Sequence, residues 1–177
     1  MKRMVWALVS VAALALLVFL ALHGPDRRQL LVEHQAEGTM QHLTTDSVNN
    51  VRITSGSFTG SFSRGPHGQW SQTGATVDAT TAANASAAIE AGLRLLHNTV
   101  PERSFETEAA EFGLSAPVLQ VTVKAVGDQT FEAIFGATNP IGLARYVRIR
   151  SAGLTTVHLM PSYMVDAWTP ALPGTAR

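Results

Sequence analysis

The chain of 177 residues contains no cysteine. This absence excludes disulfide bonds, thiolate metal sites, cysteine nucleophiles and the acylated cysteine of a bacterial lipoprotein. Charge is also scarce, because 13 basic and 13 acidic residues make up only 15% of the chain and cancel to a net charge of zero. Since a nucleic-acid-binding protein usually carries a basic excess or stripe, we expect no nucleic-acid partner.

The longest stretch without charge lies at the N-terminus. Residues 4–22, "MVWALVSVAALALLVFLAL", contain one weakly polar side chain, Ser10. As a helix this stretch would be about 28 Å long, close to the roughly 30 Å hydrocarbon core of a bilayer. Gly24-Pro25 then ends the apolar pattern. We therefore predict that residues 1–25 form a single transmembrane helix.

A cleaved signal peptide is the alternative interpretation of this segment. Both begin with a basic end, here Lys2 and Arg3, but a signal peptide has a shorter apolar run followed by an A-x-A-like site. The one such site inside the run, at 13–15, would leave "LLVFLAL" on the product, which favours an uncleaved anchor. Lys2 and Arg3 favour a cytoplasmic N-terminus, against the opposing pull of Arg27 and Arg28. We expect a bacterial inner-membrane protein with a periplasmic globular domain.

Three further segments follow the predicted anchor. Residues 26–43 mix polar and apolar side chains and are predicted to form a juxtamembrane linker or helix. Residues 44–168 have the size and patterning of one globular domain. Residues 169–177, "TPALPGTAR", are predicted to be a frayed tail.

Residues 44–168 alternate in polarity as an antiparallel sheet does. Apolar side chains at every second position, separated by tight turns, predict about six or seven strands. The expected strands cover 47–54, 58–63, the surroundings of Trp70, 118–126, 130–135, 144–150 and 154–160. A short closing helix is expected over 162–168, and a helical turn over 107–112. The fold class is therefore α+β.

One long helix is expected to cover the sheet. Apolar residues recur at helical spacing at Ala82, Ala85, Ile89, Leu93 and Leu96. Thr80 or Thr81 is the expected N-cap, and Glu90 and Arg94 stand four apart in the order that favours an ion pair. Gly92 weakens the helix interior and is expected to allow close packing on the sheet.

A motif in the second half carries a resemblance. The segment "EFGLSAP" at 111–117 precedes a hairpin, the segment "FEAIFGATNPIGLARYVRI" at 131–149 and a strand ending in "TVHLM". An aromatic-Gly-Leu-x-x-Pro turn, a later glycine and a tyrosine that opens a strand match at Phe112, Gly113, Leu114, Pro117, Gly136 and Tyr146. On these residues, 44–168 resemble the bacterial domain-of-unknown-function family numbered 4340. The resemblance implies an accessory role in the envelope beside gliding-motility-type ABC export components, with no catalytic residues to carry over.

The six histidines are the first candidates for metal or cofactor binding. None forms an H-x-x-x-H or H-E-x-x-H pattern, so we predict no metal site. His23 lies where the apolar run meets the lipid headgroups, and a histidine there can bind the metal of a tetrapyrrole. The alternative is an amphipathic residue at the interface, and we assign no cofactor. His34 and His42 are expected on a solvated surface.

Two groups of like charge stand out: the carboxylates of Glu106, Glu108 and Glu111, and the guanidinium groups of Arg145, Arg148 and Arg150. Paired carboxylates can perform acid–base chemistry, but near the start of a short helix they favour stabilisation of its dipole. The arginines could bind an acidic partner surface or form a solvated strand face. No Ser-His-Asp arrangement can be proposed from spacing, and we predict no catalytic residues.

These features predict a non-catalytic, single-pass subunit or accessory protein of a larger envelope complex. Its expected partners are the bilayer, through residues 4–22, and one or more integral membrane proteins. Small residues in the anchor would let another helix approach closely: Ala7, Ser10, Ala13 and Ala21. The alternative is a periplasmic module of an ABC-type export system that binds a lipid or glycan in an apolar groove between the long helix and the sheet.

Overall fold

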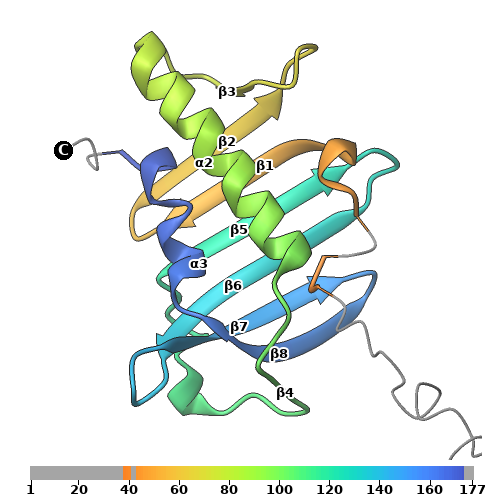
Figure 1. The fold of residues 1–177 in the computed structure, drawn as a ribbon, viewed down its shortest axis with the longest axis vertical. Coiled ribbons are helices and arrows are strands. Elements are labelled where there is room, and N and C mark those ends of the chain that lie inside the picture. Colours follow the sequence, from red (N-terminus) through yellow and green to blue (C-terminus); the bar gives the residue numbers. More distant parts are fainter. Residues whose placement is uncertain (1–37, 41–42, 174–177) are drawn as a thin grey trace, which may run out of the picture. The chain divides into compact units, whose positions relative to one another are not determined.

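The computed structural model describes residues 38–40 and 43–173, and its central element is one antiparallel sheet (Figure 1). The sheet has eight strands in the order β3-β2-β1-β5-β6-β7-β8-β4. The strands are β1 (Val48–Ser55), β2 (Phe58–Arg64), β3 (Trp70–Gln72), β4 (Arg103–Phe105), β5 (Leu119–Ala125), β6 (Thr130–Thr138), β7 (Ala144–Ser151) and β8 (Leu154–Pro161). The helices are α2 (Ala79–Asn98) and α3 (Tyr163–Asp166), with short 3-10 turns η2 (Thr45–Ser47), η3 (Ala110–Phe112) and η4 (Thr169–Ala171).

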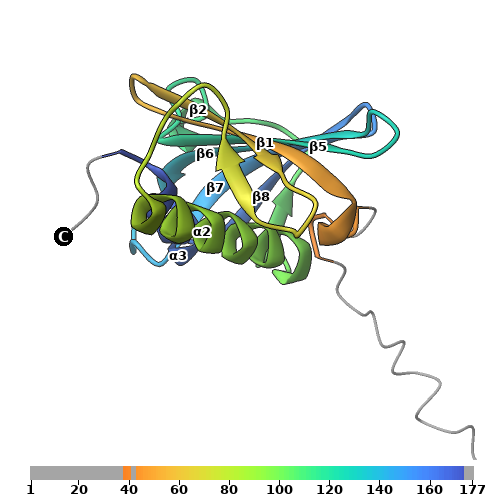
Figure 2. The same ribbon diagram turned by 90° about the horizontal axis from the view of Figure 1, so that it is seen from above.

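The long helix α2 crosses one face of the sheet diagonally, and α3 lies on the same side (Figures 1 and 2). We call this the inner face and the opposite side the outer face. The predicted α+β class and the single long covering helix are confirmed. The sequence predicted six or seven strands and missed β4. This strand has only three residues and pairs with β8 at the sheet edge. A segment so short gives no period-2 signal in the sequence.

The core lies between α2 and the inner face. Alternate residues of the central strands point into it, because successive side chains of a strand point to opposite faces. The buried side chains of the strands include Val51, Ile53, Phe62, Leu119, Val121, Val123, Phe131, Ala133, Phe135, Val147, Ile149 and Met160. The helix contributes Ala85, Ala88, Ile89, Leu93 and Leu96, so the predicted stripe is confirmed except for Ala82, which is half-buried.

The helix begins two or three residues earlier than expected. Its N-cap is Asp78, not Thr80 or Thr81 as predicted. The Asp78 carboxylate accepts a hydrogen bond from the Thr81 backbone N–H at 3.0 Å and another from the Thr81 hydroxyl at 2.6 Å. These hydrogen bonds from Thr81 lower the pKa of the exposed Asp78 carboxyl, because they favour its charged form. Aspartate and threonine are both favoured caps, and aspartate is the better of the two.

Gly92 allows close packing, but its neighbour differs from the one predicted. A Cβ atom at Gly92 would collide with the ring of Trp168, which follows α3, and not with the sheet. Trp168 is fully buried beside α2, and Met164 of α3 is buried with it. The predicted closing helix therefore exists, and it holds a tryptophan against a glycine on the long helix.

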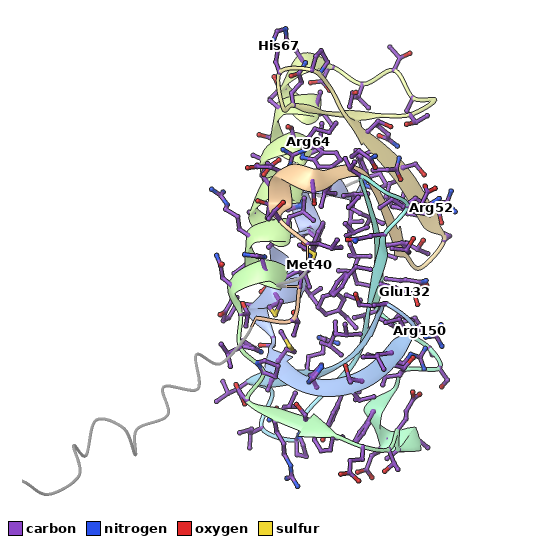
Figure 3. The ribbon with its side chains drawn as sticks, turned by 90° about the vertical axis from the view of Figure 1, so that its right-hand side faces the viewer. Met40, Arg52, Arg64, His67, Glu132 and Arg150 are labelled. Atoms are coloured by element: carbon purple, nitrogen blue, oxygen red, sulfur yellow. The ribbon has the colours of Figure 1, made fainter. Side chains whose placement is uncertain are left out.

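The domain extends slightly beyond 44–168 at both ends. Met40 and Leu43, predicted to belong to the linker, are buried in the core, and Figure 3 shows Met40 between the helix and the sheet. Thr169–Ala171 of the predicted tail form η4 beside α2, where Ala171 is buried. The predicted transmembrane segment 4–22 lies outside the described residues. None of the described helices is both long and apolar enough to span a membrane.

Candidate functional site

The outer face of the sheet is divided into an apolar half and a polar half. In the apolar half, Phe112 and Leu114 pack with Ile134 of β6 and Val157 of β8. The Phe112 ring stacks on Tyr146 with 4.1 Å between ring centroids, and each of these rings also contacts Phe105. Residues 106–117 therefore cover this half of the outer face.

Two glycines let this segment lie directly on the sheet. Gly113 follows η3 with a φ of +65°, the left-handed conformation in which glycine commonly ends a helical turn. Gly136 has no side chain where the Phe112 carbonyl approaches β6, and a Cβ atom there would collide with that oxygen. The motif residues Phe112, Gly113, Leu114, Gly136 and Tyr146 thus meet at one place, where they fix how the chain enters β5.

The polar half of the outer face carries a shallow hollow. Figure 3 shows Arg52, Glu132 and Arg150 on the side of the sheet that faces away from α2. The hollow has a volume of about 530 Å³ and is lined by Asn50, Arg52, Ser61, Ser63, Thr73, Thr122 and Lys124. We call these seven residues the cationic hollow. Its lining is made of hydroxyl, amide and cationic groups, with no aromatic side chain.

The two cations of the hollow lie on neighbouring strands. Arg52 of β1 is opposite Thr122 of β5, and Asn50 is opposite Lys124. Arg52 and Lys124 are therefore diagonal neighbours, with Cα atoms about 7–8 Å apart. Arg52 donates a hydrogen bond through Nε to Ser61 Oγ at 3.3 Å. Within residues 38–40 and 43–173, neither cation forms an ion pair with a carboxylate.

The nearest carboxylate in the register already has partners. Glu132 of β6 is opposite Thr122 on one side and Arg150 of β7 on the other. Its side chain accepts hydrogen bonds from Gln120 Nε2 at 2.7 Å and from Arg150 at 3.3 Å. The polar half therefore carries three cations, Arg52, Lys124 and Arg150, against one carboxylate.

The three arginines of β7 have different partners within the domain, and binding of an acidic partner by this strand stays a prediction. Arg148 and Arg150 face away from the buried Val147 and Ile149, and each binds a carboxylate. Arg145 donates a hydrogen bond to the carbonyl of Gly136. Burial lowers the pKa of the Arg145 guanidinium, and the negative charge of Asp166 partly opposes this effect.

The glutamates of the predicted acidic cluster also have separate roles. Glu108 pairs with Arg148 at 2.7 Å, and Glu111 lies in the first turn of η3. In the part of the chain that the structure describes, no group of three histidine or carboxylate side chains could hold a metal ion. All three glutamates were expected to stabilise the dipole of a short helix. Only Glu111 lies at the start of one, because η3 is a single turn.

Glu90 does not form the predicted ion pair with Arg94. Its carboxylate instead accepts hydrogen bonds from the guanidinium of Arg64 and from Trp70 Nε1, the latter at 2.8 Å. The Arg64 guanidinium also lies over the Trp70 ring, 4.8 Å from the centroid. This group joins α2 to β2 and β3 and serves the packing of the sheet edge.

One histidine lies in a hydrogen-bonded group that spacing did not predict. His158 of β8 has Ser104 Oγ at 2.9 Å from Nδ1 and Thr156 Oγ1 at 2.8 Å from Nε2. Burial lowers the pKa of His158 and so favours the neutral ring, which donates to one hydroxyl and accepts from the other. Neither ring nitrogen is hydrogen-bonded to a carboxylate in the described part of the chain, so the third member of a catalytic triad is missing.

The other histidines lie apart. His67 is exposed in the turn at 65–69, at the far end of the molecule in Figure 3, and His97 Nδ1 is 3.4 Å from the carbonyl of Met40. His23, His34 and His42 lie outside the described residues. The tetrapyrrole hypothesis for His23 therefore stays a prediction.

An apolar groove opens at the end of the sheet where β2 and β3 meet the start of α2. It has a volume of about 270 Å³, and its lining comes from β2, β3, the following loop, α2 and η4. The lining residues include Phe58, Phe62, Trp70, Val77, Ala82, Ala85, Ala171 and Leu172. The alternative prediction of a groove between the long helix and the sheet therefore has a counterpart at the first turns of α2.

The sequence analysis made neither Arg52 nor Lys124 a candidate site residue. Their only signal was their place at polar positions of two predicted strands, and strand register, which brings them together, cannot be read from either strand alone. No protein-family model matches the chain, and no match was found among curated proteins or solved structures. The resemblance of residues 44–168 to the family numbered 4340 stays a prediction.

Proposed function

We propose that this protein is a non-catalytic subunit or accessory protein of a larger bacterial envelope complex. In this proposal residues 4–22 anchor it in the inner membrane, and the α+β domain binds a partner in the periplasm. The observation that carries the proposal is the hollow on the outer face. Elsewhere α2 and residues 106–117 bury the faces of the sheet, whereas the cationic hollow presents polar and charged groups to solvent.

The arrangement of titratable groups supports binding over catalysis. A hydrolytic site needs a nucleophile, a base and a group that orients the base within hydrogen-bond reach of one another. Ser104 and His158 supply two of these, but Thr156 occupies the second ring nitrogen. The histidine, arginine and carboxylate clusters of the described chain are otherwise dispersed or paired.

The anchor is proposed to contribute to the same complex. Small side chains at Ala7, Ser10, Ala13 and Ala21 allow close approach of a partner helix, which stabilises helix pairs through packing in lipid. The expected partner is therefore an integral membrane protein that contacts both the anchor and the domain.

Purification of the full chain from its native membranes in a mild detergent tests the proposal. We expect one integral membrane protein to copurify in a fixed ratio and, when tagged itself, to recover this chain. A matched control replaces residues 4–22 with a leucine-rich span of equal length, which should keep the chain in the membrane but weaken the complex. A monodisperse monomer without a copurifying membrane protein would contradict the proposal.

The apolar groove supports a second candidate function, a lipid- or glycan-binding module associated with an ABC-type export system. A groove of about 270 Å³ that is lined mainly by aliphatic and aromatic side chains has room for part of an acyl chain. Mass spectrometry of lipids retained by the purified full chain tests it. We expect Ala82→Trp, which fills the groove, to lose a lipid that Ala87→Trp on the exposed side of α2 retains. Equal retention by both variants would contradict this function.

A further inference from the structure

We infer that the cationic hollow is the surface through which the domain binds its partner, and that the partner presents aspartate and glutamate carboxylates to it. This inference rests on the proposed function as a partner-binding subunit. It names the place of contact and the chemistry of the surface that fits there. The place differs from the arginines of β7, which the sequence offered as one of two interpretations, since β7 contributes none of the seven lining residues.

Polar side chains of the hollow form hydrogen bonds with one another and with Arg52. Asn50 Nδ2 donates to Ser63 Oγ at 3.4 Å, and Ser63 Oγ lies 3.3 Å from Thr73 Oγ1. Arg52 keeps its terminal guanidinium nitrogens for another partner, because its hydrogen bond to Ser61 uses Nε. A guanidinium can bind a carboxylate through two parallel hydrogen bonds, which gives a protein partner a defined orientation.

The charge balance of the polar half selects an anionic partner. Arg52 and Lys124 are exposed diagonal neighbours, and Glu132 is already bound by Gln120 and Arg150. Two like charges at this separation repel each other, and a carboxylate between them would add two attractions that outweigh this repulsion. Charge complementarity of this kind raises the rate of association and fixes the register of an interface.

A protein surface fits the hollow better than a lipid surface or a nucleic acid. Proteins that bind anionic lipids typically use clusters of about four to eight basic residues, whereas the hollow contains only Arg52 and Lys124. Single-stranded nucleic acid on a sheet face is held by stacking on aromatic side chains, and none lines the hollow. Short hydroxyl and amide side chains around two cations instead suit the polar contacts of a protein interface.

Charge reversal in the full chain tests the inference. The variant Arg52→Glu/Lys124→Glu should copurify at least about tenfold less partner, because close charge pairs at an interface typically change binding by that much or more. Arg94→Glu, on the exposed side of α2, is the matched control and should retain the partner. Both variants change exposed side chains, so their thermal unfolding should match that of the unchanged chain.

A photo-cross-linker at Thr122 identifies the surface in contact. In native membranes we expect its product to contain a peptide of the copurifying protein with aspartate or glutamate beside the cross-link. Replacing those acidic residues with lysine should restore binding to the Arg52→Glu/Lys124→Glu variant. A cross-link to lipid, or a double variant that keeps its partner, overturns the inference. If the unchanged chain has no partner at all, the proposed function fails first, so the two failures are distinguishable.

Discussion

The two faces of the sheet use the same strands for different purposes. On the inner face, apolar side chains of seven strands pack beneath α2, and Trp168 fills the space left by Gly92. On the outer face, the strands carry an apolar end under residues 106–117 and a polar end without a covering element in the described chain. Burial on the inner face and under residues 106–117 stabilises the domain, whereas the open polar end contributes no comparable apolar burial.

The division of the outer face occurs within single strands. Ile134 of β6 and Tyr146 of β7 belong to the apolar cluster, whereas Glu132 and Arg150, a few residues away on the same strands, belong to the polar half. Hydrophobic burial is roughly proportional to the apolar area removed from water, so the covering segment follows the apolar side chains and stops where they stop. The polar half therefore results from the polar residues of the strands themselves, and not only from the limited length of the covering segment.

The largest effect that this comparison predicts is at Trp168, on the inner side. Trp168→Ala removes a fully buried ring that packs on Gly92 of α2 and leaves a cavity behind it. We expect a loss of about 3–5 kcal/mol in the free energy of unfolding, because large-to-small core substitutions cost both transfer and cavity energy. Denaturant unfolding followed by tryptophan fluorescence and circular dichroism measures the change.

The control for Trp168→Ala is Tyr163→Ala in the neighbouring helix. Tyr163 is 52% exposed, so its removal should change the free energy of unfolding by no more than about 0.5 kcal/mol. Equal losses in the two variants would mean that the closing segment does not pack as a tryptophan held against a glycine.

A smaller effect is expected from the apolar half of the outer face. Phe112→Ala removes a ring that stacks on Tyr146 in a cluster of only four buried residues. We expect a loss of about 2–3 kcal/mol, below the inner-face value, because this cluster can relax toward solvent more easily than the core. Chemical denaturation measures it, and Glu106→Ala in the exposed part of the same segment is the control. A loss as large as that of Trp168→Ala would make the two faces equal contributors.

Much of the fold was predictable because its strongest signals are periodic. The alternation in β1, β2 and β5–β8 and the apolar stripe of α2 follow from local patterns that tertiary contacts reinforce. Local patterns do not show which residues of different elements contact one another. Asp78 and Thr81 are both good caps, so the choice between them depends on where the preceding loop leaves β3. Glu90 binds Arg64 of β2 and not Arg94 of its own helix. Spacing rules within a helix do not predict such a contact with a strand.

The candidate site was less predictable than the fold for the same reason. The sequence analysis grouped Arg145, Arg148 and Arg150 because they are close in sequence. In the structure two of them bind carboxylates and the third binds a carbonyl. Arg52 and Lys124 are far apart in sequence and become neighbours only through the pairing of β1 with β5. Burial and proximity of charge are properties of the sheet, so a motif search could not have found them.

The smallest predicted effect concerns pH and tests the edge of the inner face. Burial holds the pKa of His158 below its ordinary value of 6.5 in the folded domain. Below about pH 6.5 the unfolded chain therefore binds more protons at this residue than the folded one, and the free energy of unfolding falls as the pH falls until the folded His158 also titrates. Above pH 6.5 the ring is neutral in both states and contributes no slope. His158→Gln should flatten the decline in melting temperature between neutral and mildly acidic pH. An unchanged slope in His158→Gln would show that the hydroxyls of Ser104 and Thr156 stabilise the charged ring as well as the neutral one.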